Sequence, residues 1–331
     1  MLVEPSAEED ARLRSSDVAP PRPGPGEILV RATASGVNRA DALQRRGRYR
    51  QPALERPGRP PVAGMEVSGV VDEVGAGVTT WSRGDQVMAM CAGSYAELAV
   101  VDAALALRLP SGLGHHQAAS LPVALMTAYD AVVLAGQVKP GQCVLVTGAS
   151  TVVGLMACQV ALQAGAGPVL GLSRSGDGRR AIAAVGAQPL DARSELSQEL
   201  SGAIGGRGPD LVIDHVGGAV AAGAIQCLEP GGTLVSVGRI GGRTLQLDLN
   251  ELARKRLRLI GTTFRTRDLH TFRAIADGVR RSLLPLVAKE GSDGRIVPAA
   301  IECVFPFDQA NDAIDHALTQ RLPGKVVLAV S

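Results

Sequence analysis

The chain has 331 residues, of which 46% are apolar, and a formal net charge of +2 at neutral pH. This length allows two domains with sizeable cores. A nearly neutral chain with only 2% aromatic residues gives no reason to expect nucleic acid as a partner. We also expect no membrane span and a cytosolic location, because no window approaches about 18 uninterrupted apolar residues and residues 1–31 lack a signal-peptide core.

The cysteines indicate buried thiols rather than a metal site or a disulfide framework. They are odd in number and scattered, with no C-x-x-C spacing: Cys91, Cys143, Cys158, Cys227 and Cys303. His115 and His116 are adjacent, so regular secondary structure would point them in different directions. We therefore expect no bound metal.

The first third of the chain is typical of a β-rich, barrel-like domain. A Pro/Gly-rich lead-in precedes a clear strand pattern from Glu27 to Thr33. Further strands separated by glycine turns are predicted at Glu66 to Val74, Asp85 to Met90 and Tyr95 to Val101.

From about Leu121 the pattern changes to alternating strands and helices, which predicts a doubly wound parallel sheet and an α/β fold class. The strands are predicted at Cys143 to Thr147, Val169 to Leu172, Leu211 to Asp214, Thr233 to Val237 and Leu257 to Gly261. Helices are predicted between them, as at Arg179 to Val185 and Leu196 to Ile204.

The stretch from Cys143 to Ala166 has the pattern of the strand, turn and helix that open a dinucleotide-binding half. A helix starting near Val153 would direct free backbone N–H groups at a pyrophosphate, and Gly154 would allow close packing. Thr151 and Val152 replace the usual glycines. Val152 either points away, so that binding is modestly weakened and the Thr151 hydroxyl adds a donor, or enters the phosphate site and prevents binding.

The end of the second predicted strand favours NADP over NAD. NAD-binding domains carry an acidic residue at this point for the ribose hydroxyl, whereas this chain has Ser173 and Arg174, with Arg179 and Arg180 nearby. Basic residues at a helix start are also common on solvated surfaces.

Several motifs along nearly the whole chain resemble the zinc-independent quinone oxidoreductase branch of the medium-chain dehydrogenase/reductase family, which includes zeta-crystallin. They are Gly36 to Asp41, Gln44 to Tyr49, Gly64 to Gly69, Leu125 to Tyr129, the loop up to Gly154, Asp214 to Gly218 and Gly324 to Leu328.

The resemblance implies a GroES-like barrel domain at 1–122, completed by 263–331, with a Rossmann domain at 123–262, and a homodimer. NADPH would contact Thr127, Ser150, Thr151, Val152, Val153, Gly154, Ser173, Arg174, Arg179, Val216, Gly238, Phe264 and Lys325. Asn38 and Met65 stand where zinc-dependent relatives place a cysteine and a histidine. Two further positions depart from the family: Gly178 replaces a lysine, and Ala192 replaces a tyrosine.

The implied reaction is metal-free hydride transfer from NADPH to a quinone or α,β-unsaturated carbonyl, with Asn38 and Tyr49 lining the substrate site and polarising the carbonyl. These two residues could instead be a capping asparagine and a loop tyrosine packed on Pro52. An enoyl reductase-like or redox-neutral lyase/cyclase enzyme, or a non-enzymatic binding protein, are the alternatives. The basic run from Arg45 to Arg50 is either a solvated loop or a guide for acidic partners.

Overall fold

The computed structural model describes residues 1–2, 11–288, 296–319 and 323–330. Residues 3–10, part of the segment 1–31 considered above for a signal peptide, therefore lie outside the described residues. The chain divides into two compact units, each described here by itself. Unit 1 comprises Met1–Met126 and Phe264–Ser331, and unit 2 comprises Thr127–Thr263.

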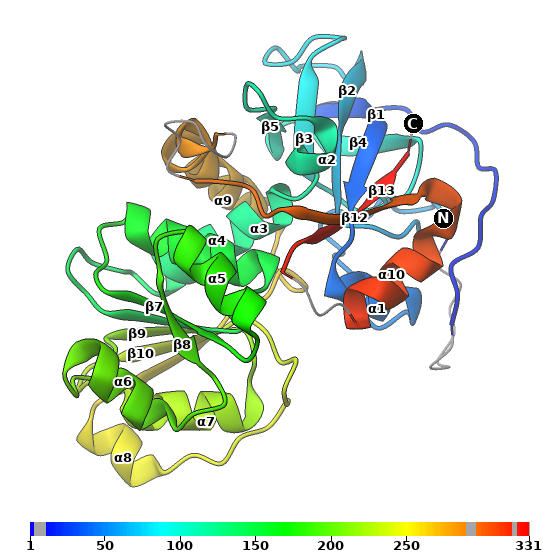
Figure 1. The fold of residues 1–331 in the computed structure, drawn as a ribbon. Helices are drawn as coiled ribbons and strands as arrows, with labels where there is room; N and C mark the ends of the chain where they lie inside the picture. Colours follow the sequence, from blue (N-terminus) through cyan, green and yellow to red (C-terminus); the bar gives the residue numbers. More distant parts are fainter. Residues whose placement is uncertain (3–10, 289–295, 320–322, 331) are drawn as a thin grey trace. The chain divides into compact units, whose positions relative to one another are not determined.

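Unit 1 is built on a seven-stranded sheet whose main path runs β12-β13-β1-β2-β3-β5, with β4 also paired to β1. Its strands are β1 (Glu27–Gly36), β2 (Glu66–Val74), β3 (Gln86–Met90), β4 (Leu98–Asp102), β5 (Ala106–Arg108), β12 (Ile301–Pro306) and β13 (Lys325–Ala329). The C-terminal strand β13 pairs antiparallel with β1, with Ala34 opposite Ala329. The barrel-like sheet therefore needs both ends of the chain (Figure 1).

The helices of unit 1 begin with α1 (Arg39–Arg45) and α2 (His115–Ala118), and α3 (Pro122–Ala128) leads into unit 2. They continue after unit 2 with α9 (Leu269–Ser282), the short 3-10 turns Leu284–Leu286 and Phe307–Gln309, and α10 (Ala310–Thr319). Helix α10 packs its buried face against α1 and β13. This packing gives unit 1 a core that joins segments from opposite ends of the sequence.

Unit 2 contains a six-stranded, fully parallel sheet in the order β11-β10-β9-β6-β7-β8. The strands are β6 (Val144–Thr147), β7 (Val169–Ser173), β8 (Gln188–Asp191), β9 (Leu211–Asp214), β10 (Thr233–Ser236) and β11 (Arg258–Gly261). The strand order reverses between β6 and β9. In sheets of this kind, ligands bind beyond the carboxyl ends of the strands at such a reversal.

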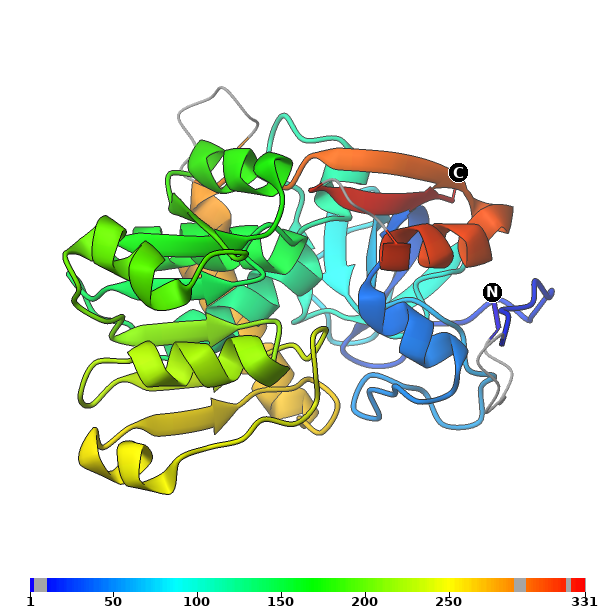
Figure 2. The same ribbon diagram turned by 60° about the horizontal axis from the view of Figure 1, so that its bottom comes forward.

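The helices of unit 2 cover both faces of its sheet (Figure 2). They are the π-helix η1 (Tyr129–Ala135), α4 (Val152–Gln163), α5 (Gly176–Ala184), α6 (Leu196–Ile204), α7 (Gly218–Cys227) and α8 (Leu249–Arg254). Covering both faces buries the central strands β6 and β9 completely, which explains their nearly unbroken apolar residues.

Most predicted elements form within a few residues of the expected bounds. Helix α5 begins at Gly176, three residues earlier than expected, because the Ser175 side chain caps it by accepting from the Gly178 N–H at 3.0 Å. Strand β4 begins at Leu98 rather than Tyr95, because Tyr95 turns inward and its N–H donates to the Ala63 carbonyl at 2.8 Å.

One helical run in the described residues, His115–Ala135, is long and apolar enough to cross a membrane by length and composition. However, 72% of its most apolar window is buried inside the protein, and the core helix of a soluble protein meets the same criteria.

Candidate active site

The turn between β6 and α4 is a tight cradle of the kind that the sequence predicts for a pyrophosphate. Gly148 has a φ of +60°, which favours glycine. A Cβ at Gly154 would lie 2.4 Å from the Gly148 carbonyl oxygen and 2.7 Å from the Ala149 Cα. Only glycine therefore lets α4 approach the turn this closely.

Thr151 caps α4 with its side chain. Its Oγ1 accepts from the Gly154 N–H at 3.1 Å and donates to the Gly148 carbonyl at 2.9 Å. The expectation that this hydroxyl adds a phosphate donor is therefore not met, because its hydrogen already has an acceptor within the turn.

The turn nevertheless keeps its shape with Val152 as the first residue of the helix. The N–H groups of Val152 and Val153 lie in the first turn of α4, where no carbonyl of the same helix can accept from them. They therefore point out of the helix N-terminus. Ser150 adjoins them in the turn. The donor set of this loop fits an anionic group.

At the strand reversal, Asp214 organises the neighbouring loop. Its carboxylate accepts from Thr147 Oγ1 at 2.6 Å, from the Val216 N–H at 3.1 Å and from the Gly217 N–H at 3.0 Å. Val216 is thereby brought beside the phosphate turn, since a Cβ at Gly148 would lie 3.2 Å from Val216 Cγ2. Asp214 belongs to a family motif but is not among the predicted site residues, although a carboxylate at the end of a fully apolar strand indicates such a role.

Gly238 joins this group of residues through a close backbone approach. Its N–H donates to the Asp214 carbonyl at 3.1 Å, and a Cβ there would lie 2.4 Å from the His215 carbonyl oxygen. Burial lowers the pKa of His215, so this side chain stays neutral at physiological pH. The Nε2 atom of His215 is buried and has no hydrogen-bond partner among the described residues.

Three serines meet at the end of β7. Ser173 Oγ lies 3.1 Å from Ser150 Oγ and accepts from the Ser175 N–H at 3.4 Å. A Cβ at Gly178 would lie 2.1 Å from Ser173 Oγ and 2.8 Å from the Ser150 Cβ. The lysine that the family carries at this position could not be accommodated without moving these serines.

The two arginines predicted beside these serines differ in availability. Arg179 forms a 2.9 Å ion pair with Asp191 and donates to the Ser173 carbonyl at 3.4 Å. Arg174 is exposed and makes no ion pair with any residue that the structure describes. The Ala192 N–H, where the family has a tyrosine, donates to the Ser173 carbonyl at 3.1 Å. The prediction of a basic phosphate contact therefore rests on Arg174.

Thr127 is the first residue of unit 2 and is half-buried near the end of α3. The π-helix η1 follows directly. Such helices are rare and frequently occur at functional sites. No pattern in the sequence marked this one.

In unit 1 a buried ion pair holds Asn38. Lys325 Nζ lies 2.5 Å from Glu66 Oε1 and 2.9 Å from Asn38 Oδ1, and Asn38 Nδ2 donates to the same Glu66 oxygen at 2.9 Å. Glu66 is 0% exposed and Lys325 is 3% exposed. The second carboxylate oxygen of Glu66 accepts from the Val123 N–H at 2.8 Å.

The amide of Asn38 is thus fully engaged. Its nitrogen also donates to the Gly36 carbonyl at 3.3 Å, so both amide hydrogens and the oxygen have partners inside unit 1. This arrangement disfavours the predicted role of Asn38 as a free donor. It also gives the Lys325 ammonium partners other than a cofactor.

Tyr49 is the better placed of the two predicted donors. Its ring lies 5.4 Å from the Arg265 guanidinium carbon, in a cation–π contact. Burial and the nearby Asp41 carboxylate raise the pKa of Tyr49 to about 12. The phenol stays protonated at physiological pH, and none of the described residues accepts its hydrogen.

Asp41 caps the N-terminus of α1. Its Oδ2 accepts from the Asn38 N–H and from the Tyr95 hydroxyl, each at 2.7 Å, while its Oδ1 has no partner among the described residues. Burial raises the pKa of Asp41 to about 7, above its usual value of 3.8.

We expect this carboxyl group to make stability depend on pH. Between about pH 4 and 7 the folded chain retains a proton that the unfolded chain has released, so stability falls as pH rises through this window, by at most about 4 kcal/mol. The Asp41→Asn variant cannot ionise there and should show a flatter profile when the melting temperature is measured from pH 4 to 8. The exposed Asp177→Asn variant is the control, and a parent profile matching that of Asp41→Asn would contradict the expectation.

Phe264 lies in unit 1, whereas most predicted cofactor residues lie in unit 2. Its ring stacks on Phe272 with a centroid distance of 5.2 Å, and Arg267 lies over it at 5.9 Å. These contacts give Phe264 a structural role in the core of unit 1.

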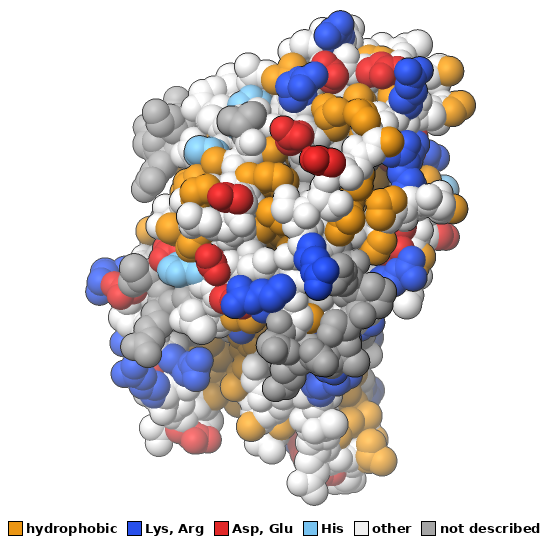
Figure 3. Space-filling model, turned by 90° about the vertical axis from the view of Figure 1, so that its right-hand side faces the viewer, with side chains coloured by type: hydrophobic (Ala, Val, Ile, Leu, Met, Phe, Trp, Pro, Cys, Tyr) orange, Lys and Arg blue, Asp and Glu red, His pale blue; other side chains and the backbone are white. Residues whose placement is uncertain are grey.

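Two arginines of the basic run that was predicted as a possible guide for acidic partners are paired within unit 1. Arg45 is buried and pairs with Asp315 at 2.6 Å, and Arg50 pairs with Glu55. On the face of the molecule shown in Figure 3, basic and acidic side chains are interspersed rather than gathered into one patch.

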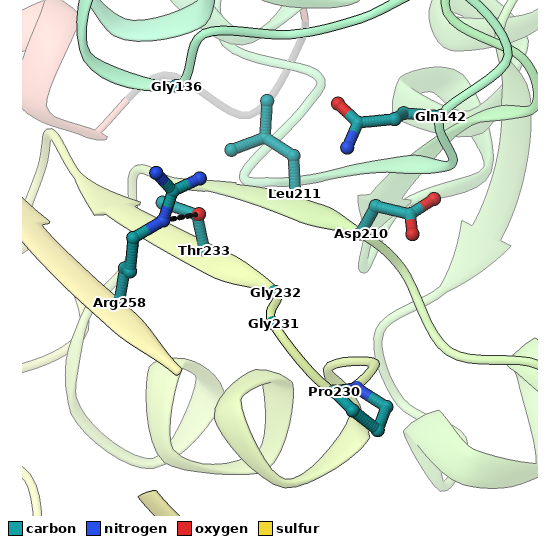
Figure 4. Close-up of a pocket in the computed structure, with 9 residues that line it drawn as sticks. All are labelled: Gly136, Gln142, Asp210, Leu211, Pro230, Gly231, Gly232, Thr233 and Arg258. Atoms are coloured by element: carbon teal, nitrogen blue, oxygen red, sulfur yellow. Dashed lines mark hydrogen bonds between the residues drawn. The ribbon is translucent and has the colours of Figure 1, made fainter. Parts of the chain in front are cut away.

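A small hollow of about 110 Å³ in unit 2 lies at the amino ends of β9, β10 and β11, away from the predicted site residues. Arg258, hydrogen-bonded to Thr233, forms one wall, and Asp210 and Gln142 form another (Figure 4). Parallel sheets bind ligands at the opposite, carboxyl edge. This hollow is therefore not the candidate active site.

No three histidine, cysteine or acidic side chains of the described segments are grouped so that they could hold a metal ion. Met65, at one predicted ligand position, is a buried thioether. All five cysteines are free, and burial raises the pKa of Cys91 to about 12, which leaves it without nucleophilic thiolate at physiological pH.

Two family models match the chain: an alcohol dehydrogenase GroES-like domain over residues 24–111 and a zinc-binding dehydrogenase domain over residues 152–279. Quinone oxidoreductase-like protein 2 of Rattus norvegicus is 31% identical over 321 residues, which cover 96% of this chain and 89% of that protein. The chain belongs to the quinone oxidoreductase branch of the medium-chain dehydrogenase/reductase family.

Solved structures support the same conclusion. The quinone oxidoreductase of Thermus thermophilus, also solved in complex with NADPH, is 30% identical, with a TM-score of 0.80 and full coverage of both chains. Among the related sequences, the polyketide synthase component PikAII of Streptomyces venezuelae is 32% identical over a region that covers 97% of this chain and 8% of that protein. The predicted GroES-like and Rossmann folds are confirmed, and the chain is an oxidoreductase.

Proposed function

We propose that this chain reduces a quinone or an α,β-unsaturated carbonyl compound with NADPH, without a metal. The observation that supports this most is the Gly148–Gly154 cradle at the strand reversal of unit 2, in a chain whose relatives include quinone oxidoreductases. The related Thermus enzyme was solved with NADPH. We also retain the domain bounds 1–122 with 263–331 and 123–262, and a homodimer, as proposals.

The residues fit the cofactor in chemical terms. The N–H groups of Ser150, Val152 and Val153 would hold the pyrophosphate, with Thr151 and Gly154 shaping the turn. Ser173 and Arg174 would hold the adenosine phosphate, and Thr127, Val216 and Gly238 would line the remaining length of the cofactor. When bound, the nicotinamide supplies the hydride. Everything else required of the protein is orientation, exclusion of water and a hydrogen-bond donor.

We assign the donor role to Tyr49. A quinone or enone carbonyl gains negative charge as it is reduced, and a protonated phenol can donate a hydrogen bond to that oxygen. Asn38 acts as a positioning residue, because Glu66 and Lys325 occupy its amide. In this assignment the buried Glu66–Lys325 pair holds Asn38 at the start of α1. It thereby steadies α1, which Tyr49 follows in the chain.

NADPH is expected to bind more tightly than NADH. Arg174 is the exposed cation beside Ser173, so the Arg174→Glu variant should reverse the preference by repelling a 2′-phosphate. Fluorescence titrations of the Arg174→Glu variant should then give an NADPH affinity at least about tenfold lower than that of the parent, and an NADH affinity that is little changed. Arg180→Glu, which removes a neighbouring exposed arginine paired with Asp177, is the matched control. Equal titration curves for the two cofactors in the parent would contradict the assignment.

The central test is an assay of NADPH oxidation with 1,4-naphthoquinone, before and after dialysis against a metal chelator. The proposal requires saturable oxidation that is unchanged by dialysis, since Asn38 and Met65 replace zinc ligands. A tightly held zinc ion whose removal abolishes the rate would overturn the metal-free part.

The alternative is an enoyl reductase-like or redox-neutral lyase/cyclase enzyme. Val152 in the phosphate turn and the engaged Thr151 hydroxyl favour it over a typical cofactor loop. Failure to bind NADPH in the same assay, with a correctly folded protein, would make this alternative the better proposal.

A further inference from the structure

A groove on unit 1 is separate from every residue proposed above for cofactor or substrate. It has a volume of about 690 Å³ and lies among the turn after β2, the turn after β4 and helix α9. We call it the arginine groove. Its main lining residues are Trp81, Ala104, Arg108, Arg273, Arg280 and Leu284.

Two arginines of α9 fix the helix against the barrel and define the length of the arginine groove. Arg273 donates to Asp102 Oδ2 at 2.6 Å from Nη2 and 3.2 Å from Nε, and its Nε also donates to Asp102 Oδ1 at 3.3 Å. Arg280 Nη2 donates to the Ala104 and Ala106 carbonyls at 2.6 and 3.2 Å. Seven residues of helix separate these two arginines by about 10.5 Å.

The surface between these two arginines is mostly apolar. It includes Val78, Ala104 and Leu284, together with Trp81, which is 7% exposed. The Trp81 indole N–H already donates to the Ala103 carbonyl at 3.1 Å. A ligand would therefore meet apolar atoms here rather than an unsatisfied polar group.

The charged rim of the arginine groove has an excess of positive charge. Arg108 lies 4.9 Å over the Trp81 ring, and its nearest carboxylate is Asp85 at 3.4 Å. Asp277, the carboxylate nearest Arg280, is shared with Arg281. Among the lining residues themselves, three arginines face one carboxylate: Arg108, Arg273 and Arg280 against Asp102.

The rim also has unused hydrogen-bond donors. A guanidinium carries five N–H groups. Arg280 uses Nη2 for the two carbonyls and Nη1 for a long contact to Asp277, and Arg108 uses one nitrogen for the Thr80 carbonyl and one for Asp85. Each can still donate to an added anion.

We propose that the arginine groove binds a small amphipathic carboxylate, a monoanion whose apolar body lies along Trp81, Ala104 and Leu284 and whose carboxylate meets Arg280 or Arg108. The excess of arginines over carboxylates in the lining favours an anion, and the volume lies within the range of small-molecule sites. This site is independent of the proposed reduction reaction.

Trp81 makes the proposal directly testable, since it is the one tryptophan in the sequence. Titration of the full chain with decanoate should change the tryptophan emission saturably, with matching heat in calorimetry. Decanol and decylammonium share the apolar body but lack the negative charge, so each should bind at least tenfold more weakly. Equal binding of all three would indicate apolar partitioning only and would overturn the proposal.

Two substitutions locate the binding. Arg280→Met should weaken decanoate binding about tenfold, since a charge-assisted hydrogen bond is lost, whereas Arg281→Met changes the adjacent arginine outside the lining and should leave the affinity within about twofold. Ala104→Phe, at an exposed lining position, should fill the groove and abolish binding even if the Arg280 variant folds poorly. Unchanged binding by Ala104→Phe, or an equal loss in the Arg280 and Arg281 variants, would place the ligand elsewhere and overturn the proposal.

Discussion

The Lys325→Met variant is expected to lower the free energy of unfolding of unit 1 by about 3 to 5 kcal/mol, because it leaves a buried carboxylate without its counter-charge. Glu66 is 0% exposed, and its Oε1 accepts from both Lys325 and Asn38. Without the ammonium group, either the charge remains unpaired or Glu66 takes up a proton. Both outcomes cost stability.

Urea unfolding followed through Trp81 measures this effect, since that residue reports on unit 1 rather than on both units. The exposed Lys139→Met variant should stay within about 0.5 kcal/mol of the parent. The double variant Lys325→Met with Glu66→Gln should lose less than the two single losses added together, since the charge and its partner are removed together. A loss under about 1 kcal/mol for Lys325→Met would show that the pair contributes little.

The parallel sheet of unit 2 could be predicted because its signals are local. Strand, turn and helix follow one another within a few residues, and the apolar strands reflect burial on both faces. The role of Gly154 in close packing could be predicted from the local pattern, and the structure gives both Gly148 and Gly154 a geometric reason to be glycine. Thr151 was harder, because a hydroxyl beside a phosphate turn can either donate outward or cap the helix.

The Glu66–Lys325 pair could not be predicted in this way, because 259 residues separate its members. Its sequence signal is weak but physical. Each residue is the first of a mostly buried strand, β2 or β13, and a charged side chain is rarely buried in such a place unless it is paired. Antiparallel pairing of both strands with β1 brings these strand ends to the same region of the barrel.

Pairing with residues distant in the sequence also explains why the availability of the basic residues could not be predicted. The sequence gives no sign that Arg179 and Arg45 are paired, yet Asp191 and Asp315 form ion pairs with them. The pairs form because β8 lies beside β7, and α10 lies against α1. Charge in a sequence therefore indicated how many cations exist but not which of them remain free.

The Tyr49→Phe variant is expected to lower kcat for quinone reduction about 100-fold while leaving NADPH affinity and stability nearly unchanged, if our proposed function is correct. Removing one hydrogen-bond donor from a developing oxyanion costs rates of this order. None of the described residues accepts the Tyr49 hydroxyl hydrogen, so its loss leaves no buried acceptor unpaired in the free protein. The pKa of about 12 keeps this donor protonated, so its contribution should be constant from pH 6 to 9.

Tyr95→Phe is the matched control, because it removes the other buried phenol of unit 1. Tyr95 donates to Asp41 at 2.7 Å inside the core, so its loss should reduce stability by about 1 to 3 kcal/mol but leave kcat of the folded enzyme unchanged. Asn38→Leu should behave like Tyr95→Phe in stability, since it leaves the Glu66–Lys325 pair without its amide partner. If Tyr49→Phe retained kcat within threefold while Asn38→Leu lost it in a folded protein, Asn38 rather than Tyr49 would be the donor, and the ion pair would hold the catalytic group itself.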